Sequence, residues 1–234
     1  MGALPIVLVL VAACERASER DPPKPPPKPP EPVEAIDIVI AIDLSKSMEE
    51  TDLPPDRLGA TQNALRKFVA ASGRDRLGIV LYARDVRRLA ELTTDTKSID
   101  RAIAKLQIGD VDELGTAIGD GLAEAVDELR PSTAKHKVVL LVGDGDNNSV
   151  THFGPDQAAA LARQAGVTVY TFLSGAENPD GFTMATNPKT FIDVAAATSG
   201  TFHRAPNVAA FDRGLAEVRA KLDAMKAPAG VPAP

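Results

Sequence analysis

Residues 36–47 read Ile-Asp-Ile-Val-Ile-Ala-Ile-Asp-Leu-Ser-Lys-Ser, an apolar run that ends in one carboxylate and two hydroxyls at alternate positions. An Ile- and Val-rich run followed by a helical pattern is typical of a buried central strand in an α/β sheet. Asp43, Ser45 and Ser47 should therefore emerge at the carboxyl end of that strand, where such sheets bind ligands. Oxygen groups of these types suit a hard divalent cation such as Mg²⁺, whereas softer metals favour Cys or His. The stretch predicts a metal-dependent binding site.

The composition favours one folded domain with extensions. The chain has 234 residues, of which 44% are hydrophobic, and this is enough to bury a sizeable core. Its formal net charge is -6, its charges of both signs are interspersed, and it contains no tryptophan. A chain without a basic face or stacking platforms is not expected to bind nucleic acid. Its single cysteine excludes an intramolecular disulfide and a thiolate metal cluster.

The N-terminus carries the pattern of a lipidated protein. Residues 4–13 are almost wholly apolar, and Val11-Ala-Ala-Cys14 closes the run with small side chains. This resembles the lipobox of bacterial lipoproteins, which implies a signal peptide over 1–13, cleavage before Cys14 and lipidation of that cysteine. The run is too short to span a bilayer permanently, and no Lys or Arg precedes it. The alternative is an uncleaved apolar N-terminus with an incidental cysteine.

A proline-rich stalk is predicted within residues 14–34. Asp21-Pro-Pro-Lys-Pro-Pro-Pro-Lys-Pro-Pro-Glu-Pro32 cannot form helix or sheet, because proline lacks the backbone donor and fixes φ. Such a segment serves as an extended spacer, with a ligand for proline-binding domains as the alternative. We expect a folded domain over 35–226, lipid-anchored to a membrane of the bacterial cell envelope and facing out of the cytoplasm, and a Pro/Ala tail over 227–234.

From residue 35 onward, strand-like runs alternate with amphipathic helical patterns. The alternation predicts an α/β fold with a doubly wound, mostly parallel six-stranded sheet and helices on both faces. The predicted strands are 36–44, 76–83, 86–92, 138–142, 167–173 and 200–204. The predicted helices are 57–71, 96–105, 116–129, 155–165, 190–198 and 208–225. Strand 86–92 follows its predecessor too closely for a crossover, so it should pair antiparallel at an edge.

Two further segments place oxygen groups at the same edge of the predicted sheet. Gly115-Thr-Ala-Ile-Gly-Asp-Gly-Leu122 puts Thr116 where a loop enters a helix, and Val138-Val-Leu-Leu-Val-Gly-Asp-Gly-Asp146 puts Asp144 at the end of a buried strand. Taken singly, such residues are commonly strand caps, turn formers or, for Thr116, a helix N-cap. The convergence of three segments that offer only oxygen ligands favours a metal site.

These segments, in this order, closely resemble the von Willebrand factor A (VWA) family, and within it the bacterial Bat-type aerotolerance proteins. The matching stretches are residues 37–47, Asp-Arg-Leu-Gly-Ile-Val-Leu-Tyr-Ala (75–83), Gly-Thr-Ala-Ile-Gly-Asp-Gly-Leu (115–122) and Asp-Gly-Asp-Asn-Asn (144–148). The resemblance covers about residues 35–225. It implies the Rossmann-like VWA fold and a metal-ion-dependent adhesion site (MIDAS).

By this likeness, the hydroxyls of Ser45, Ser47 and Thr116 would contact Mg²⁺ or Mn²⁺ directly. Asp43 and Asp144 would act largely through water. One coordination position would stay open for an Asp or Glu side chain of a protein partner, because two carboxylates already balance the dication. The implied function is protein binding rather than catalysis.

The chain departs from the family pattern next to the last aspartate. Family members usually carry Thr where this chain has Gly143, which removes a side-chain hydroxyl close to the expected site. Bat-type relatives commonly carry Glu at the position of Asp146. The Gly143 departure motivates one alternative, a VWA scaffold that no longer binds metal.

Two other chemistries fit the sequence less well. Residues 144–148 resemble the start of an EF-hand loop, but the sixth position is Ser149 rather than Gly and the twelfth is Pro155 rather than Glu. A metal-assisted enzyme is the second alternative, yet the sequence has no Gly-x-Ser-x-Gly, His-Glu-x-x-His or phosphate-binding Gly-x-x-x-x-Gly-Lys motif. The three histidines are scattered, and His152, which follows the Asp144 loop, is the one that could border the site.

Overall fold

A computed structural model describes residues 35–149, 152–176 and 186–226. The predicted signal peptide, Cys14, the stalk and the Pro/Ala tail lie outside the described residues, so they stay predictions. Within the described ranges, no helix is long and apolar enough to cross a membrane.

A six-stranded sheet forms the centre of the domain, in the order β3-β2-β1-β4-β5-β6. Edge strand β3 pairs antiparallel with β2, and the other neighbouring strands are parallel. The predicted doubly wound sheet with one antiparallel edge strand is confirmed. The strands are β1 (Asp37–Asp43), β2 (Arg76–Tyr82), β3 (Val86–Thr93), β4 (Lys137–Gly143), β5 (Val167–Ser174) and β6 (Phe202–Ala205).

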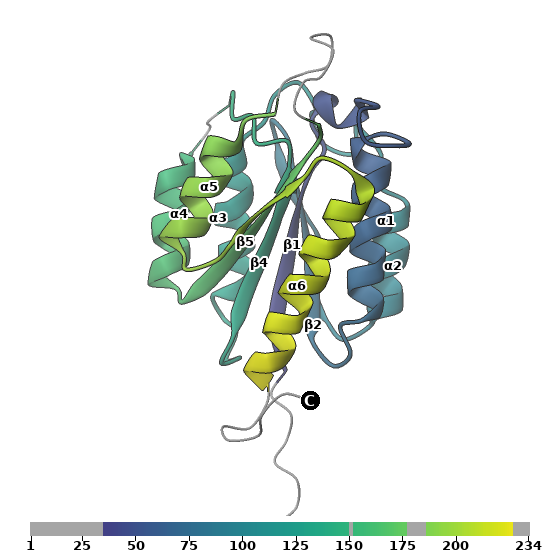
Figure 1. Cartoon of the computed structure of the whole chain (residues 1–234). Helices are drawn as coiled ribbons and strands as arrows, with labels where there is room; N and C mark the ends of the chain where they lie inside the picture. Colours follow the sequence, from purple (N-terminus) through teal and green to yellow (C-terminus); the bar gives the residue numbers. More distant parts are fainter. Residues whose placement is uncertain (1–34, 150–151, 177–185, 227–234) are drawn as a thin grey trace, which may run out of the picture. The chain divides into compact units, whose positions relative to one another are not determined.

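Helices cover both faces of the sheet (Figure 1). They are α1 (Arg57–Ala70), α2 (Thr96–Ala104), α3 (Ile118–Leu129), α4 (Pro155–Gln164), α5 (Pro188–Ala197) and α6 (Val208–Lys226), with a short 3-10 helix η1 (Lys46–Glu49). Ile38, Ile40 and Ile42 of β1 pack on the side of α1, α2 and α6. Val39 and Ala41 pack on the side of α3, α4 and α5. Burial on both faces explains why β1 reads as a continuous apolar run.

Two element boundaries near the predicted site differ from the prediction. Helix α3 begins at Ile118 with Ala117 as its N-cap, so Thr116 lies in the preceding loop, and the predicted helix start at residue 116 is wrong. The alternative reading of Thr116 as the N-cap does not apply either. Helix η1 was not predicted, because four residues are too few to show a helical period. The start of α1 is as predicted, since the Asp56 side chain accepts the backbone N–H of Gly59 at 2.6 Å.

A buried aspartate joins the residue before β1 to the last helix. Asp75 is fully buried, and its carboxylate accepts the backbone N–H of Ile36 at 3.0 Å. The same carboxylate pairs with Arg219 at 2.9 Å and with Lys226 at 2.8 Å. These contacts gather at the amino end of β1. The folded chain is therefore clamped at the end of the sheet opposite to Asp43.

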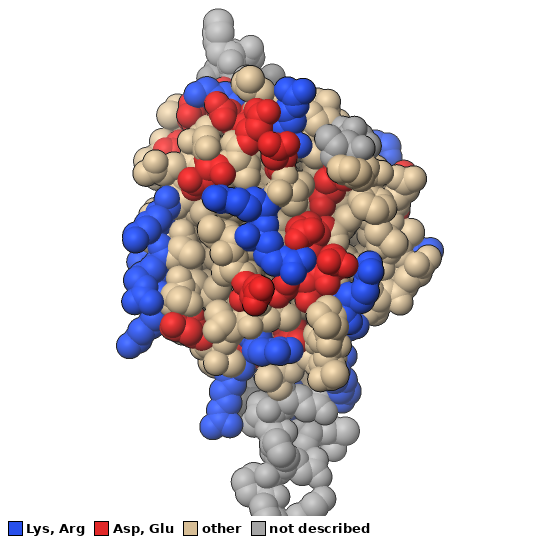
Figure 2. Space-filling view, turned by 180° about the vertical axis from the view of Figure 1, so that it is seen from behind, with Lys and Arg blue, Asp and Glu red and all other residues tan. Residues whose placement is uncertain are grey.

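Charged side chains of both signs are interspersed on the face seen from behind (Figure 2). Between β3 and α3, for example, Arg88 contacts Glu124 at 2.7 Å and Glu128 at 2.5 Å. This face does not present the continuous basic surface that nucleic-acid binding needs.

Candidate metal-binding site

Asp43 is the last residue of β1, a central strand of the sheet, and its side chain is fully buried. Its Oδ1 accepts the backbone N–H of Ser45 at 2.8 Å. Its Oδ2 is buried and has no hydrogen-bond partner among the residues that the structure describes. Burial first, and then the negative charge of Asp144, raise the pKa of Asp43 well above its usual value. A buried carboxylate oxygen without a donor is costly, and a cation is one group that can satisfy it.

Two serines follow Asp43 in the turn that leads into η1. Their Oγ atoms lie 3.1 Å apart. The hydroxyl of Ser45 interacts with Asp43 and that of Ser47 with Asp144, and each interaction partly offsets the raised pKa of its carboxylate. Met48 is fully buried and fixes η1 against the core. Four of the five predicted site residues therefore come together: Asp43, Ser45, Ser47 and Asp144.

Asp144 follows directly after β4 and is almost completely buried. Its Oδ1 accepts the backbone N–H of Asp146 at 3.2 Å, and its Oδ2 accepts Nη1 of Arg57 at 3.1 Å. Burial raises the pKa of Asp144, while Ser47, the Asp146 N–H and Arg57 oppose that rise. Both carboxylates of the site are thus disfavoured as ions in the metal-free protein.

Arg57 is a site residue that the sequence prediction missed. Its guanidinium is fully buried and pairs with both oxygens of Asp52, at 2.8 and 2.9 Å. A signal was available, because Arg57 is in helical phase with Thr61, Ala64 and Phe68, which form the buried face of α1. An arginine on the apolar stripe of a helix rarely stays buried without a partner.

Thr116 lies in the loop before α3 and is buried. Its backbone N–H donates to Oδ1 of Asn148 at 2.8 Å, and its carbonyl accepts the N–H groups of Asn148 and Ser149 at 3.2 and 3.0 Å. In the same loop, the carbonyl of Glu113 accepts the N–H of Lys46 in η1 at 3.2 Å. The loop before α3 is therefore tied to the segments that carry Asp144 and the two serines, and Thr116 lies at the same edge of the sheet.

Gly143 shares a small space with Tyr82. A Cβ at position 143 would lie 2.6 Å from the Tyr82 hydroxyl oxygen and 2.6 Å from Asp43 Oδ2. The Tyr82 hydroxyl donates to the carbonyl of Val142 at 2.9 Å, and burial, followed by the charges of Asp43 and Asp144, raises its pKa well above the usual value. The space that a side chain at position 143 would need is thus taken by the Tyr82 hydroxyl and by Asp43 Oδ2.

The donor set fits a hard dication. Within the described ranges, no cluster of three or more His, Cys, Asp or Glu side chains is arranged to hold a metal. An ion at this edge would therefore depend on serine and threonine hydroxyls together with two carboxylates, which are ligands that Mg²⁺ and Mn²⁺ accept and soft metals disfavour.

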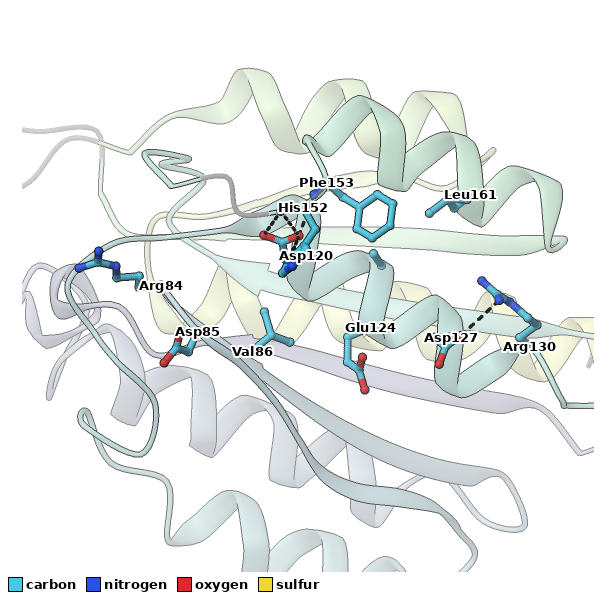
Figure 3. A pocket seen from close by; sticks show the side chains of 11 residues that line it. Arg84, Asp85, Val86, Asp120, Glu124, Asp127, Arg130, His152, Phe153 and Leu161 are labelled. Atoms are coloured by element: carbon cyan, nitrogen blue, oxygen red, sulfur yellow. Dashed lines mark hydrogen bonds and ion pairs between the residues drawn. The ribbon is translucent and has the colours of Figure 1, made fainter.

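A groove of about 560 Å³ lies along α3, lined by residues that include Asp120, His152 and Phe153 (Figure 3). Asp120 is buried, and its carboxylate accepts the backbone N–H groups of His152 at 3.1 Å and Phe153 at 2.8 Å. Gly119 permits this close approach, since a Cβ there would lie 2.1 Å from the Phe153 carbonyl oxygen. The His152 side chain is 79% exposed beside Asp120. His152 therefore lines this groove, where its backbone is held by Asp120 of α3.

The other two histidines lie at the amino end of the sheet (His136) and three strands away from β1 in the sheet order (His203). His136 precedes β4, and its carbonyl accepts the N–H of Asp37 at the amino end of β1. His203 in β6 stacks on Phe172, with ring centroids 4.9 Å apart. The stacked ring of His203 therefore has a structural role.

Comparison with known proteins extends these observations. The family profile of the von Willebrand factor type A domain matches residues 37–206. A UPF0353 protein of Mycolicibacterium gilvum is 31% identical over 154 residues, covering 59% of this chain and 44% of that protein. The chain spans about half the length of the curated relatives it matches.

Two solved structures share the fold. An aerotolerance-related membrane protein from Bacteroides fragilis has a TM-score of 0.71 at 20% identity, covering 80% of this chain and 100% of that chain. Proximal thread matrix protein 1 from the mussel byssus, described with a zinc-occupied MIDAS motif, has a TM-score of 0.64 at 23% identity, covering 82% of this chain and 46% of that chain.

Proposed function

We propose, because the chain belongs to the von Willebrand factor type A domain family, that it binds a protein partner through a divalent cation at the carboxyl edge of its sheet. Ser45, Ser47 and Thr116 would supply hydroxyl ligands to Mg²⁺ or Mn²⁺. Asp43 and Asp144 would balance the charge of the ion and contact it largely through bound water molecules. The bound ion would supply an electrophilic position for an acidic side chain of the partner.

The observation that carries this proposal is the buried Oδ2 of Asp43, which has no hydrogen-bond partner among the described residues. It belongs to a carboxylate that is fully buried beside a second buried carboxylate, Asp144. Asp144 already pairs with Arg57, whereas Asp43 Oδ2 has neither a donor nor a cation among the described residues, and a dication would satisfy it. The zinc-occupied MIDAS motif of the mussel protein supports the view that this fold can hold a dication.

Charge balance favours an acidic partner. The two carboxylates would neutralise the dication, and the Arg57 guanidinium next to Asp144 is itself balanced by Asp52. An Asp or Glu side chain of the partner would be attracted to the open position of the ion. A basic partner residue would meet repulsion at the same position.

The described chain enters the domain at the end of β1 opposite to the proposed metal site. Ile36, the second described residue, is held by Asp75 at the amino end of β1, and Asp43 ends the same strand. We infer that a lipid on Cys14 tethers the domain in the bacterial cell envelope.

The metal part of the proposal is tested by calorimetric titration of the full chain with Mn²⁺ alone. We expect saturable binding of one ion, lost in Asp43→Ala and in Thr116→Ala. Thr94→Ala is the matched control, because Thr94 is exposed and follows the partner of Leu77, at the opposite end of β2 from Tyr82, which pairs with Asp43. Absence of heat and of thermal stabilisation in the parent would instead identify a scaffold that no longer binds metal.

The partner part is tested by capture from envelope extracts of the source organism on the immobilised chain. We expect an acidic protein that is retained with Mn²⁺ or Mg²⁺, released by EDTA and not retained by Asp43→Ala. Retention that is unchanged by EDTA would contradict a metal-bridged contact. Chelator-sensitive turnover of a small substrate would favour the metal-assisted enzyme.

A further inference from the structure

Arg57 places a permanent positive charge inside the proposed metal site. Its side chain is fully buried, and its Nη1 lies 3.1 Å from Asp144 Oδ2 and 3.4 Å from the carbonyl oxygen of Ser47. A guanidinium stays protonated in proteins. Asp144 therefore has a cationic partner in the protein before any metal is bound.

The position of this guanidinium is fixed from the other side. Asp52 binds it through both carboxylate oxygens, and Asp52 Oδ2 also accepts the backbone N–H of Ala176 at 2.7 Å. Gly175 closes the space behind it, because a Cβ there would lie 2.6 Å from Arg57 Nε. Arg57 cannot move far from Asp144 when a second cation arrives.

We propose that Arg57 and the metal ion are competing counter-charges for Asp144, so that each weakens the stabilisation given by the other. This inference deepens the proposed function and rests on it, because it concerns regulation of the same site. Two cations held on one buried carboxylate repel each other strongly, since the surroundings screen charge poorly. Arg57 would thus keep the metal-free site assembled and, by the same interaction, lower its affinity for the dication.

The two effects are linked thermodynamically. If Arg57 weakens metal binding, then bound metal must weaken the contribution of Arg57 to stability by the same factor. If Arg57 had only a structural role, its substitution would lower the stability of the protein equally with and without metal. Metal affinity therefore separates the proposed role of Arg57 from simple support of the fold.

The test compares Arg57→Met, Arg57→Lys and Arg66→Met in the full chain. Arg66 is the matched control, because it lies on the same helix and binds both oxygens of Asp100 at 2.7 and 3.2 Å, but it is 43% exposed. The measurements are the Mn²⁺ dissociation constant by calorimetry and the thermal midpoint in EDTA and in saturating Mn²⁺. The double variant Asp52→Asn with Arg57→Met removes the carboxylate that the single variant leaves unpaired, in case the single variant does not fold.

We expect Arg57→Met, or the double variant, to lower the midpoint in EDTA and to bind Mn²⁺ at least about tenfold more tightly than the parent. Its gain in midpoint with Mn²⁺ should exceed that of the parent. Arg57→Lys keeps the charge and should bind within about threefold of the parent. Arg66→Met should match the parent in both measurements.

Equal or weaker Mn²⁺ binding by the Arg57→Met variants, with binding by the parent intact, would overturn this inference and leave the proposed function standing. Binding by those variants but not by the parent would overturn metal-dependent function in the natural protein and support the competition. Absence of binding in all variants and in the parent would overturn both.

Discussion

Tyr82 and Gly143 are sterically coupled across the sheet, because the Tyr82 hydroxyl oxygen would lie 2.6 Å from a Cβ at position 143. We predict that Gly143→Ala costs about 1–3 kcal/mol of unfolding free energy, as expected for overpacking a buried site. In a Tyr82→Phe background the same substitution should cost at least about 0.5 kcal/mol less, since one of the two clashing oxygens is gone. Urea unfolding of the four proteins measures both quantities. Strictly additive costs would show that the two residues do not compete for the space.

The raised pKa of Asp43 predicts a specific pH dependence. In the metal-free protein this carboxyl keeps its proton to a higher pH than in the unfolded chain, where its pKa is near 3.8. As pH rises above about 4, the unfolded state therefore loses this proton first, and stability from this group falls until pH passes the folded-state pKa. Asp144 shifts in the same direction and adds to the fall.

Asp43→Asn should reduce this fall in stability. We expect the metal-free variant to unfold at a higher temperature than the parent at neutral pH, and to gain nothing from Mn²⁺. Thermal scans in EDTA between about pH 4 and 8 make the comparison. Asp100→Asn is the control, because Arg66 lowers rather than raises the pKa of Asp100. A variant that loses stability at neutral pH in EDTA would show that ionised Asp43 supports the metal-free fold.

The Asp75 clamp predicts a large effect far from the metal site. Asp75→Asn breaks buried contacts with Arg219 and Lys226, and loss of one partner from such a buried group costs about 3–5 kcal/mol. Asp100→Asn breaks an exposed pair and should cost about 1 kcal/mol or less. Denaturant unfolding compares the two, and a similar small cost for both would contradict the clamp. Mn²⁺ affinity should stay unchanged in Asp75→Asn.

Asp120 is predicted to anchor the segment that follows the Asp144 loop. Asp120→Ala removes the acceptor for the backbone N–H groups of His152 and Phe153, at a cost of about 1–3 kcal/mol. Hydrogen exchange at these two amides should become faster. Asp127→Ala, at a residue of the same helix whose side chain is 54% exposed, should leave this exchange unchanged. Unaltered exchange in Asp120→Ala would mean that other contacts hold the segment.

Most of the fold could be predicted because β1 is buried on both faces and therefore forms a continuous apolar run. In the later strands and helices, the spacing of apolar residues indicates the type of element. The edge location of Asp43, the two serines and Asp144 followed from the parallel order of β1 and β4. The predicted limit of α3 was wrong because Asn147 and Asn148 bind the start of this helix from a different segment, through the N–H groups of Ile118 and Thr116. Local propensity does not report such contacts.

Arg57 was missed for a similar reason. Its partner Asp144 lies 87 positions away in sequence. In addition, an arginine at the start of a helix is ordinarily expected to be exposed to solvent. Its helical phase with the buried face of α1 was the available signal. The Tyr82 and Gly143 pair crosses from β2 to β4, and a motif comparison of position 143 alone shows only a missing hydroxyl. The signal peptide, the lipid on Cys14 and the stalk stay predictions.

The proposed function requires that one dication be held jointly by five side chains, those of Asp43, Ser45, Ser47, Thr116 and Asp144. A crystal structure with Mn²⁺, located by its anomalous scattering, tests this most directly. We expect one strong peak at the carboxyl edge of β1, within about 2.5 Å of the hydroxyl oxygens of Ser45, Ser47 and Thr116. No peak at this edge in crystals saturated with Mn²⁺, or a peak bound elsewhere, would contradict it.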